Sequence, residues 1–319
     1  MLTRRKLLAA MGGAAALPAM SACGVLDDQS TSSSGSKTLR IAFNSNVTAL
    51  PVWVAQDEGF LKEQGLKAKF TVVENVATMP PALGRSFDVV LSTPTLLISA
   101  TAQKLPAVQI AGSSIDNEAN PSGHVLVPKD SDIKSIKDLK GKKLGVLNET
   151  GSLHIATKYW LQKEGVSPDS VQAVQVNGPA QPDQLASGRI DAVETVAPFS
   201  TTMLAKGNKS IGIPYRAIAP EVSAIFWIAG KSWAEENAEK VAKFQKALKQ
   251  GEEFIASDDA GARKIAAKYT KLPPDVVNKI KLPEYDTTVH GDDLDEWLTA
   301  MREVNGFKGD VNVKDLVVK

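Results

Sequence analysis

The sequence has little of several features that mark large classes of protein. Among its 319 residues it has a single cysteine, Cys23, so an intramolecular disulfide is excluded. Apart from residues 7–22, it contains no apolar run near the roughly 20 residues that a membrane-spanning helix needs. Its 37 Lys and Arg residues are balanced by 36 Asp and Glu residues. This balance leaves no basic excess for nucleic acid or for an anionic membrane surface.

The sequence also lacks the common motifs of catalysis and metal binding. Its three histidines, His124, His154 and His290, are far apart and show no metal-ligand spacing. It has no Gly-x-Ser-x-Gly nucleophile elbow and no Gly-x-x-x-x-Gly-Lys-Ser/Thr loop for ATP. We therefore expect no catalytic residues, no metal site and no cofactor, and we expect that the chain is not an enzyme.

The N-terminus is typical of a targeting segment for export. It reads MLTRRKLLAAMGGAAALPAMSAC, in which the two arginines fit either a twin-arginine signal or an ordinary basic signal region. MSAC resembles the cleavage box of bacterial lipoproteins, in which the cysteine is acylated, although Met20 replaces the usual Leu. We predict a lipoprotein signal peptide at residues 1–22, lipidation at Cys23 and a flexible Ser-rich tether at residues 23–36. The alternative is a signal-peptidase cut just before an incidental cysteine.

The rest of the chain alternates between strand and helix patterns. Short β-rich runs separated by helical spacing predict an α/β fold with parallel sheets and helices on both faces. After Ile228 the pattern becomes mostly helical, and Val241, Phe244 and Leu248 form one apolar face. The expected strands are residues 39–43, 69–73, 87–91, 107–111, 125–127, 143–147, 171–176 and 190–193.

Several expected strands end in polar turns that lead into helices. The turn NSNVTALP follows the first strand, STPTLL follows FDVVL, and NETGSLH follows KKLGVL. The fourth such turn, ETVAPF, lies at the end of the strand expected at residues 190–193. In open α/β sheets, ligands bind at the carboxyl ends of strands, where helix N-termini offer free amides to an anion or a polar acceptor. Each turn alone is explained by an ordinary helix cap of Ser, Thr or Asn. Several together predict a binding site.

Four segments resemble a known family in their order and spacing. They are LPVWVAQDEGFLKEQGLKAKF at 50–70, GRSFDVVLSTPTLLISATAQKLPAVQIAG at 84–112, DLKGKKLGVLNETGSLHIATKYWLQKEGV at 138–166 and LASGRIDAVETVAPF at 185–199. The set resembles the substrate-binding proteins of ABC importers, in the group that includes the nitrate, sulfonate and taurine binders and the thiamine-precursor binders. The resemblance covers nearly the whole chain after the tether.

The resemblance implies a two-lobed periplasmic-binding-protein-like fold of type II, with two doubly wound mixed sheets joined by two crossing strands. Lobe one would hold residues 37–124 and 223–319, and lobe two would hold residues 125–222. GHVLVP and SAIFWIAG would be the crossings. A ligand would lie in the cleft between the lobes, which would close over it.

The resemblance also implies that the polar turns face this cleft. Asp116 and Glu194 would favour a ligand with an amine or ring N–H donors, and none of the four turns carries Arg or Lys, which disfavours a phosphate ester. Trp227 is equally consistent with core filling, and His154 is equally consistent with a solvated helix position. The predicted ligand-binding residues are Asn44, Asn46, Thr93, Thr95, Asp116, Thr150, Gly151, Ser152, Glu194 and Trp227.

The implied function is to capture a small organic solute and deliver it to a permease that a separate ATPase drives. A taurine-like sulfonate is the preferred solute, and a thiamine pyrimidine precursor, riboflavin or another nitrogen heterocycle is the alternative. Relatives that make the thiamine pyrimidine use a run of cysteines that this chain lacks, whereas a signalling receptor would need the same cleft. We expect a monomer that binds no nucleic acid and is anchored through Cys23 to the outer face of the cytoplasmic membrane.

Replacing Cys23 tests the anchor separately from the cleft. We expect Cys23→Ser to release the protein from membranes and to leave solute binding unchanged, because several acyl chains together provide the stable attachment. Fractionation of cells that express the wild type and the variant measures the effect. A variant that stays in the membrane fraction would contradict the lipid assignment.

Overall fold

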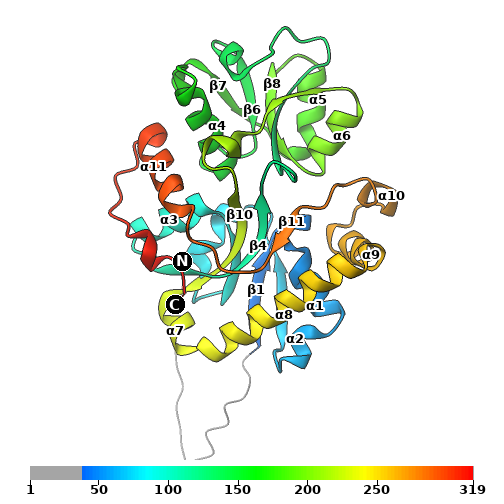
Figure 1. The fold of residues 1–319 in the computed structure, drawn as a ribbon, viewed down its shortest axis with the longest axis vertical. Helices are drawn as coiled ribbons and strands as arrows, with labels where there is room; N and C mark the ends of the chain where they lie inside the picture. Colours follow the sequence, from blue (N-terminus) through cyan, green and yellow to red (C-terminus); the bar gives the residue numbers. More distant parts are fainter. Residues whose placement is uncertain (1–37, 319) are drawn as a thin grey trace, which may run out of the picture. The chain divides into compact units, whose positions relative to one another are not determined.

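The computed structural model describes residues 38–318 and contains two mixed β-sheets with helices packed against them (Figure 1). The α/β class expected from the alternating strand and helix patterns is therefore confirmed. The predicted signal peptide at residues 1–22, the tether at residues 23–36 and Cys23 lie outside the described residues.

The larger sheet has six strands in the order β11-β4-β10-β3-β1-β2. The neighbouring strands β1, β2 and β3 are parallel, whereas β10 runs antiparallel to both β3 and β4, and β11 runs antiparallel to β4. The strands are β1 (Leu39–Phe43), β2 (Ala68–Val72), β3 (Val89–Ser92), β4 (Ala107–Asp116), β10 (Val222–Gly230) and β11 (Glu284–Asp286).

The smaller sheet has five strands in the order β7-β6-β8-β5-β9. Here β6 is parallel to β7 and β8, and β5 is antiparallel to β8 and β9. The chain crosses from one sheet to the other through residues 117–122 and returns through residues 213–221. The stretches GHVLVP and SAIFWIAG, predicted as the crossings, instead lie mostly in β5 and β10. The strands are β5 (Gly123–Val127), β6 (Lys143–Val146), β7 (Gln172–Gln175), β8 (Ala192–Val196) and β9 (Lys209–Gly212).

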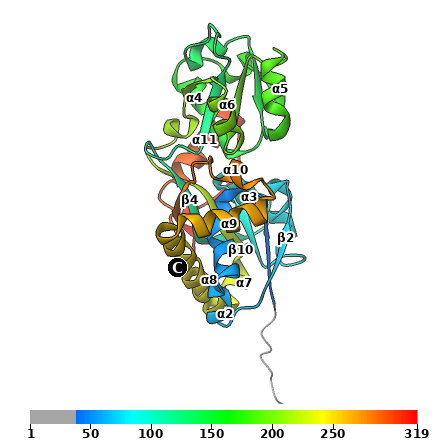
Figure 2. The same cartoon turned by 90° about the vertical axis from the view of Figure 1, so that its right-hand side faces the viewer.

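Helices accompany both sheets. α4, α5 and α6 lie with the smaller sheet, whereas α1, α3, α8 and α9 lie with the larger one (Figures 1 and 2). None of the helices within residues 38–318 combines the length and the apolar character needed to cross a membrane. The helices are α1 (Leu50–Asp57), α2 (Phe60–Glu63), α3 (Pro94–Ala102), α4 (Ser152–Lys163), α5 (Gln181–Ala186), α6 (Phe199–Ala205), α7 (Lys231–Glu236), α8 (Ala238–Ser257), α9 (Asp259–Thr270), α10 (Pro274–Val277) and α11 (Leu294–Asn305).

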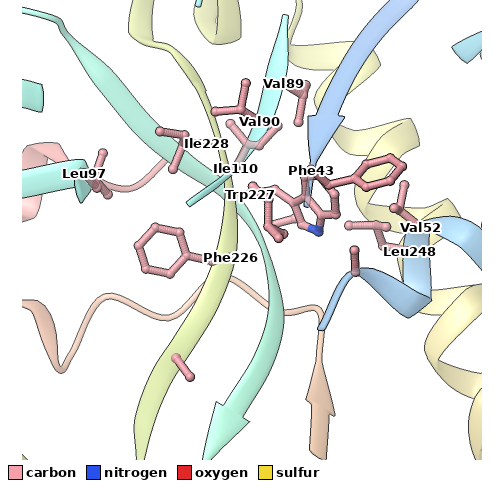
Figure 3. Close-up of a cluster of buried hydrophobic side chains, with 14 of the residues drawn as sticks. Phe43, Val52, Val89, Val90, Leu97, Ile110, Phe226, Trp227, Ile228 and Leu248 are labelled. Atoms are coloured by element: carbon pink, nitrogen blue, oxygen red, sulfur yellow. The ribbon is translucent and has the colours of Figure 1, made fainter. Parts of the chain in front are cut away.

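The core of the larger sheet is built around β10, which is buried on both faces. Successive side chains of a strand point to opposite faces. Trp227 accordingly points toward Phe43 and Leu248, while Phe226 points the other way, toward Leu97 (Figure 3). Trp227 is fully buried and packs edge-on against the Phe244 ring of α8, with ring centroids 5.8 Å apart.

Helix α8 is in tight contact with α1 at Gly251. A Cβ atom at this position would lie 2.3 Å from the backbone carbonyl oxygen of Pro51, so only glycine fits without a shift of one helix. The position is buried within α8, where an alanine would otherwise be the better helix former.

For an alanine at this position, steric crowding therefore opposes the gain in helix propensity. We expect Gly251→Ala to lower the free energy of unfolding by about 1–3 kcal/mol, as overpacking does in other cores. Lys246→Ala, on an exposed position of the same helix, should change it by less than about 0.5 kcal/mol. Urea unfolding of both variants measures the difference, and a stabilised Gly251→Ala variant would show that the helices separate easily.

Candidate functional site

A cavity of about 150 Å³ lies where the two sheets meet. Its walls come from the loop after β1, the end of β8, both crossing segments, the start of β10 and the loop before β11. The lining residues are Asn44, Asn46, Val47, Thr48, Asn120, Pro121, Ser122, Val196, Ala197, Tyr215, Ala224, Ile225, Lys281, Leu282 and Pro283. The cavity therefore touches parts of the chain that belong to both sheets.

Asn44 and Asn46 line this cavity from the polar turn that follows β1. The Asn46 side chain caps a short 3-10 helix by accepting a hydrogen bond from the Thr48 backbone N–H at 3.0 Å. Its Nδ2 donates to the carbonyl oxygen of Ala197, at the end of β8, at 3.3 Å. The Oδ1 of Asn44 is buried and has no hydrogen-bond partner among the described residues. The turn thus links the two sheets, and one of its two lining asparagines carries a buried acceptor without a partner in the described residues.

The helix starts at Thr95 and Ser152 contact each other directly, outside the cavity lining. Their hydroxyl oxygens are 3.0 Å apart, and the Thr95 hydroxyl also lies 3.4 Å from the backbone carbonyl of Thr150. Thr93 and Gly151 occupy the N-cap positions of α3 and α4. The Thr93 side chain does not cap α3, and glycine has no side chain that could cap α4. Thr150 is exposed, and both its backbone N–H and its hydroxyl donate to Asn148 Oδ1. These residues bring the two helix N-termini together.

Asp116 and Trp227 are not among the residues that line the cavity. Asp116 is fully buried, and its carboxylate accepts hydrogen bonds from Ser122 and Arg216. Trp227 belongs to the core of the larger sheet, where its indole Nε1 has no partner within the described part of the chain. Their assignment as ligand contacts remains a prediction.

Glu194 forms a buried pair with His154 behind the β8 wall of the cavity. Glu194 Oε2 lies 3.1 Å from His154 Nδ1, and both residues are largely or fully buried. Its second oxygen, Oε1, is without a hydrogen-bond partner in residues 38–318. Burial, together with the negative charge of Glu194, raises the pKa of Tyr215, a residue of the cavity wall. The charge of Glu194 therefore affects the ionisation of a wall residue, although neither Glu194 nor His154 lines the cavity.

Thirteen of the fifteen residues that line the cavity were not predicted from the sequence, among them three from distant parts of the chain. Tyr215 and Ser122 come from the crossing segments, and Lys281 comes from a loop more than 80 residues beyond the last predicted polar turn. The Lys281 ammonium donates to the carbonyl oxygen of Ala119 at 2.6 Å. This lysine supplies a cation at the cavity that the four polar turns lack. Local sequence patterns contain no signal for such non-local wall residues.

The described residues offer no evident metal centre. Within residues 38–318, no group of three or more His, Cys, Asp or Glu side chains is arranged to hold a metal ion. The polar groups at the cavity are amides, hydroxyls, a tyrosine and one lysine. Groups of these types can form hydrogen bonds with a small molecule, and the lysine can offer it a positive charge.

Comparison with known proteins identifies the family. Residues 46–262 match the family described as NMT1/THI5 like, which is more than half of the chain. The chain belongs to this family. A 4-amino-5-hydroxymethyl-2-methylpyrimidine phosphate synthase, THI5 of Saccharomyces cerevisiae, is 26% identical over 252 residues, which cover 74% of this chain and 71% of the yeast protein.

Solved structures establish the fold. The periplasmic aliphatic sulphonate binding protein SsuA of Escherichia coli superimposes with a TM-score of 0.76 at 18% identity, covering 88% of this chain and 97% of SsuA. The periplasmic nitrate-binding protein NrtA of Synechocystis PCC 6803 gives a TM-score of 0.72 at 11% identity, covering 87% and 84%. The structure therefore has the periplasmic-binding-protein fold, and both the predicted fold and the predicted resemblance are confirmed.

The expectation that the chain is not an enzyme is contradicted by the same comparison. The yeast relative is a synthase, and a synthase from Aspergillus parasiticus is 28% identical over 245 residues, covering 70% of this chain and 69% of its own length. The expectation rested on missing motifs, and such a search detects only the chemistries whose motifs it includes.

The His154–Glu194 pair generates a pH prediction. Burial opposes a charge on the imidazole, but the charge of Glu194 and the hydrogen bond to it outweigh burial and raise the pKa of His154 above 6.5. The folded protein thus holds this proton more tightly than the unfolded chain. The stabilisation is complete below about pH 6.5 and is lost as the pH rises through the folded pKa. We expect His154→Gln to cost more unfolding free energy at about pH 5.5 than at about pH 8.5.

Urea unfolding at the two pH values measures this difference. His124→Gln is a control of opposite sign, because burial lowers the pKa of His124 and its folded form favours the neutral ring. That variant should lose less stability at the acidic pH than at the basic one. Equal losses for His154→Gln at both values would contradict the charged pair.

Proposed function

We propose that the chain is the solute-binding component of an ABC importer and captures a small organic solute in the cavity between the two sheets. One observation carries this proposal: the cavity is walled by both sheets and by both crossing segments. A solute held there contacts parts of the chain that can move relative to each other. It therefore stabilises the arrangement in which those parts are together, through its differential affinity for that arrangement.

The size and chemistry of the cavity favour a solute with one ring. Engineered apolar cavities of about 150 Å³ bind benzene, and this cavity has a similar volume with Val47, Val196 and Leu282 among its walls. The unpartnered Oδ1 of Asn44 would accept a hydrogen bond from a ring N–H or an amino group. The relatives named for a pyrimidine phosphate support the same class. We favour a nitrogen heterocycle related to the thiamine pyrimidine.

A taurine-like sulfonate is the second candidate. Lys281 offers a cation at the cavity, which the polar turns alone do not supply. The structural similarity to SsuA, an aliphatic sulphonate binding protein, points in the same direction. An aminosulfonate would place its sulfonate near Lys281 and its amine near Asn44.

The sequence supports the rest of the proposed role. The N-terminal segment with MSAC supports export and lipid anchoring at Cys23, on the outer face of the cytoplasmic membrane. The sheets would close over the solute and dock on a permease in a separate chain, with a separate ATPase. The chain would act as a monomer in this role.

A thermal-shift screen tests the proposal and separates the two solute classes. Thiamine pyrimidines, taurine, alkanesulfonates, nitrate, riboflavin and small aromatic acids would each be added to the purified protein. A solute at a hundred times its Kd should add about 2.7 kcal/mol to the free energy of unfolding. Mass spectrometry of each mixture shows whether the compound is recovered unchanged or converted. No stabilisation by any of these compounds would contradict the proposed solute classes.

Asn44 provides a sharper test, because its replacement should weaken solute binding without lowering the stability of the empty protein. A buried acceptor without a partner costs free energy in the empty protein. We expect Asn44→Ala to weaken binding of the solute found in the screen by about tenfold, while leaving the stability of the empty protein unchanged or higher. Calorimetry and urea unfolding measure the two effects.

Asn46→Ala is the matched control from the same turn. It removes the bond to Ala197 and the cap on the 3-10 helix, so the empty protein should be less stable by about 1 kcal/mol. Unchanged solute affinity in Asn44→Ala would show that Asn44 does not contribute to solute binding.

A further inference from the structure

One buried carboxylate joins the two crossings between the sheets. Asp116 is the last residue of β4 and is fully buried. Its Oδ2 accepts hydrogen bonds from the backbone N–H of Ser122 at 2.5 Å and from the Ser122 hydroxyl at 2.7 Å. Its Oδ1 pairs with the guanidinium of Arg216, whose Nη2 also donates to the Asp116 backbone carbonyl at 2.9 Å.

Ser122 and Arg216 lie in different crossings. Ser122 directly precedes β5, in the segment that leads from the larger sheet to the smaller one. Arg216 lies in the 3-10 helix Pro214–Ala217, in the segment that returns from β9 to β10, and its Nη1 donates to the carbonyls of Ala219 and Pro220. The side chain of Asp116 therefore holds both segments at once.

Both tied segments form part of the cavity wall. Ser122 lines the cavity itself, and Tyr215, which lines it from the second crossing, is the neighbour of Arg216. Hydrogen bonds to a charged group in a buried setting are strong, because little water competes for either partner. A change in this network consequently moves two walls of the cavity together.

We propose that Asp116 is a positioning residue that couples the two crossings into a single hinge. The coupling fixes how readily the sheets adopt the arrangement in which Thr95 touches Ser152. Asp116 acts through Ser122 and Arg216 and is not itself part of the cavity lining. The consequence for solute affinity rests on the proposed function, whereas the coupling itself is a property of the empty protein.

Disulfide trapping across the two helix starts measures the coupling directly. The Thr95 and Ser152 hydroxyl oxygens are 3.0 Å apart, so Thr95→Cys with Ser152→Cys places two thiols at the contact between the sheets. The chain has one other cysteine, and Cys23→Ser in the full chain prevents mispairing. The rate of disulfide formation under a mild oxidant, without solute, reports how often the two helix starts meet.

In this background we expect Asp116→Asn and Arg216→Gln each to slow trapping by roughly threefold or more, and the double variant to be no slower than the slower single one. Such non-additivity is the signature of two groups that act as one unit. Ser122→Ala removes a single bond of the network and should give a smaller decrease. It keeps the test decisive if Asp116→Asn does not fold.

Two controls separate positioning from a general loss of stability. Leu144→Ala, in the core of the smaller sheet, should lower the melting temperature without slowing trapping. Asn117→Ala removes a more exposed link between the crossings, through Glu221 at 3.1 Å, and should slow trapping less than Asp116→Asn. Unchanged trapping in Asp116→Asn, additive effects in the double variant, or equal slowing by Leu144→Ala would overturn the proposal. Because no solute is present, these outcomes are independent of the screen that tests the proposed function.

Discussion

The double passage of the chain between its sheets is the constraint on which the site depends. Two sheets joined by two connecting segments can form a cavity at their junction, beside an apolar cluster to which both sides contribute. The walls of that cavity are the polar turn after β1, the end of β8 and the crossings themselves. Contacts that link these segments therefore determine the shape of the site as much as the residues that line it.

Several polar contacts across this junction are direct. Asn46 reaches the end of β8, and the hydroxyls of Thr95 and Ser152 meet between α3 and α4. Further along, Gln162 of α4 donates to Glu303 of α11 at 2.8 Å, and the rings of Tyr215 and Trp297 pack edge to face. The Asn46 and Gln162 contacts are partly or fully exposed and contribute little net free energy, because water competes for them, whereas the Thr95–Ser152 contact and the Tyr215–Trp297 pair are buried. The junction is thus held by polar contacts together with buried apolar packing.

The sequence predicts the fold better than the site. The eight expected strands lie within a few residues of β1 to β8, because buried runs such as DVVL and LRIAF are unambiguous. The short strands β9 and β11 were missed: KSIG is polar and EYD has three residues, too few for a periodic signal. Asn44 and Asn46 could be predicted from a polar turn after a strand. Tyr215 and Lys281 could not, because long-range folding alone brings them to the cavity.

Unpartnered buried polar atoms indicate a ligand contact only where their residue also lines a cavity. Trp53 Nε1, Trp227 Nε1 and Ser114 Oγ are unpartnered in the described structure, yet these residues lie outside the cavity lining. Asn44 Oδ1 is unpartnered and its residue lines the cavity. An unpartnered polar atom in the core costs free energy in every state of the protein. At a cavity, that cost is removed when a ligand brings a hydrogen-bond donor. Natural proteins keep such unfavourable groups where function uses them. This distinction makes Asn44, rather than the larger and more conspicuous Trp227, the residue from which the chemistry of the solute is inferred.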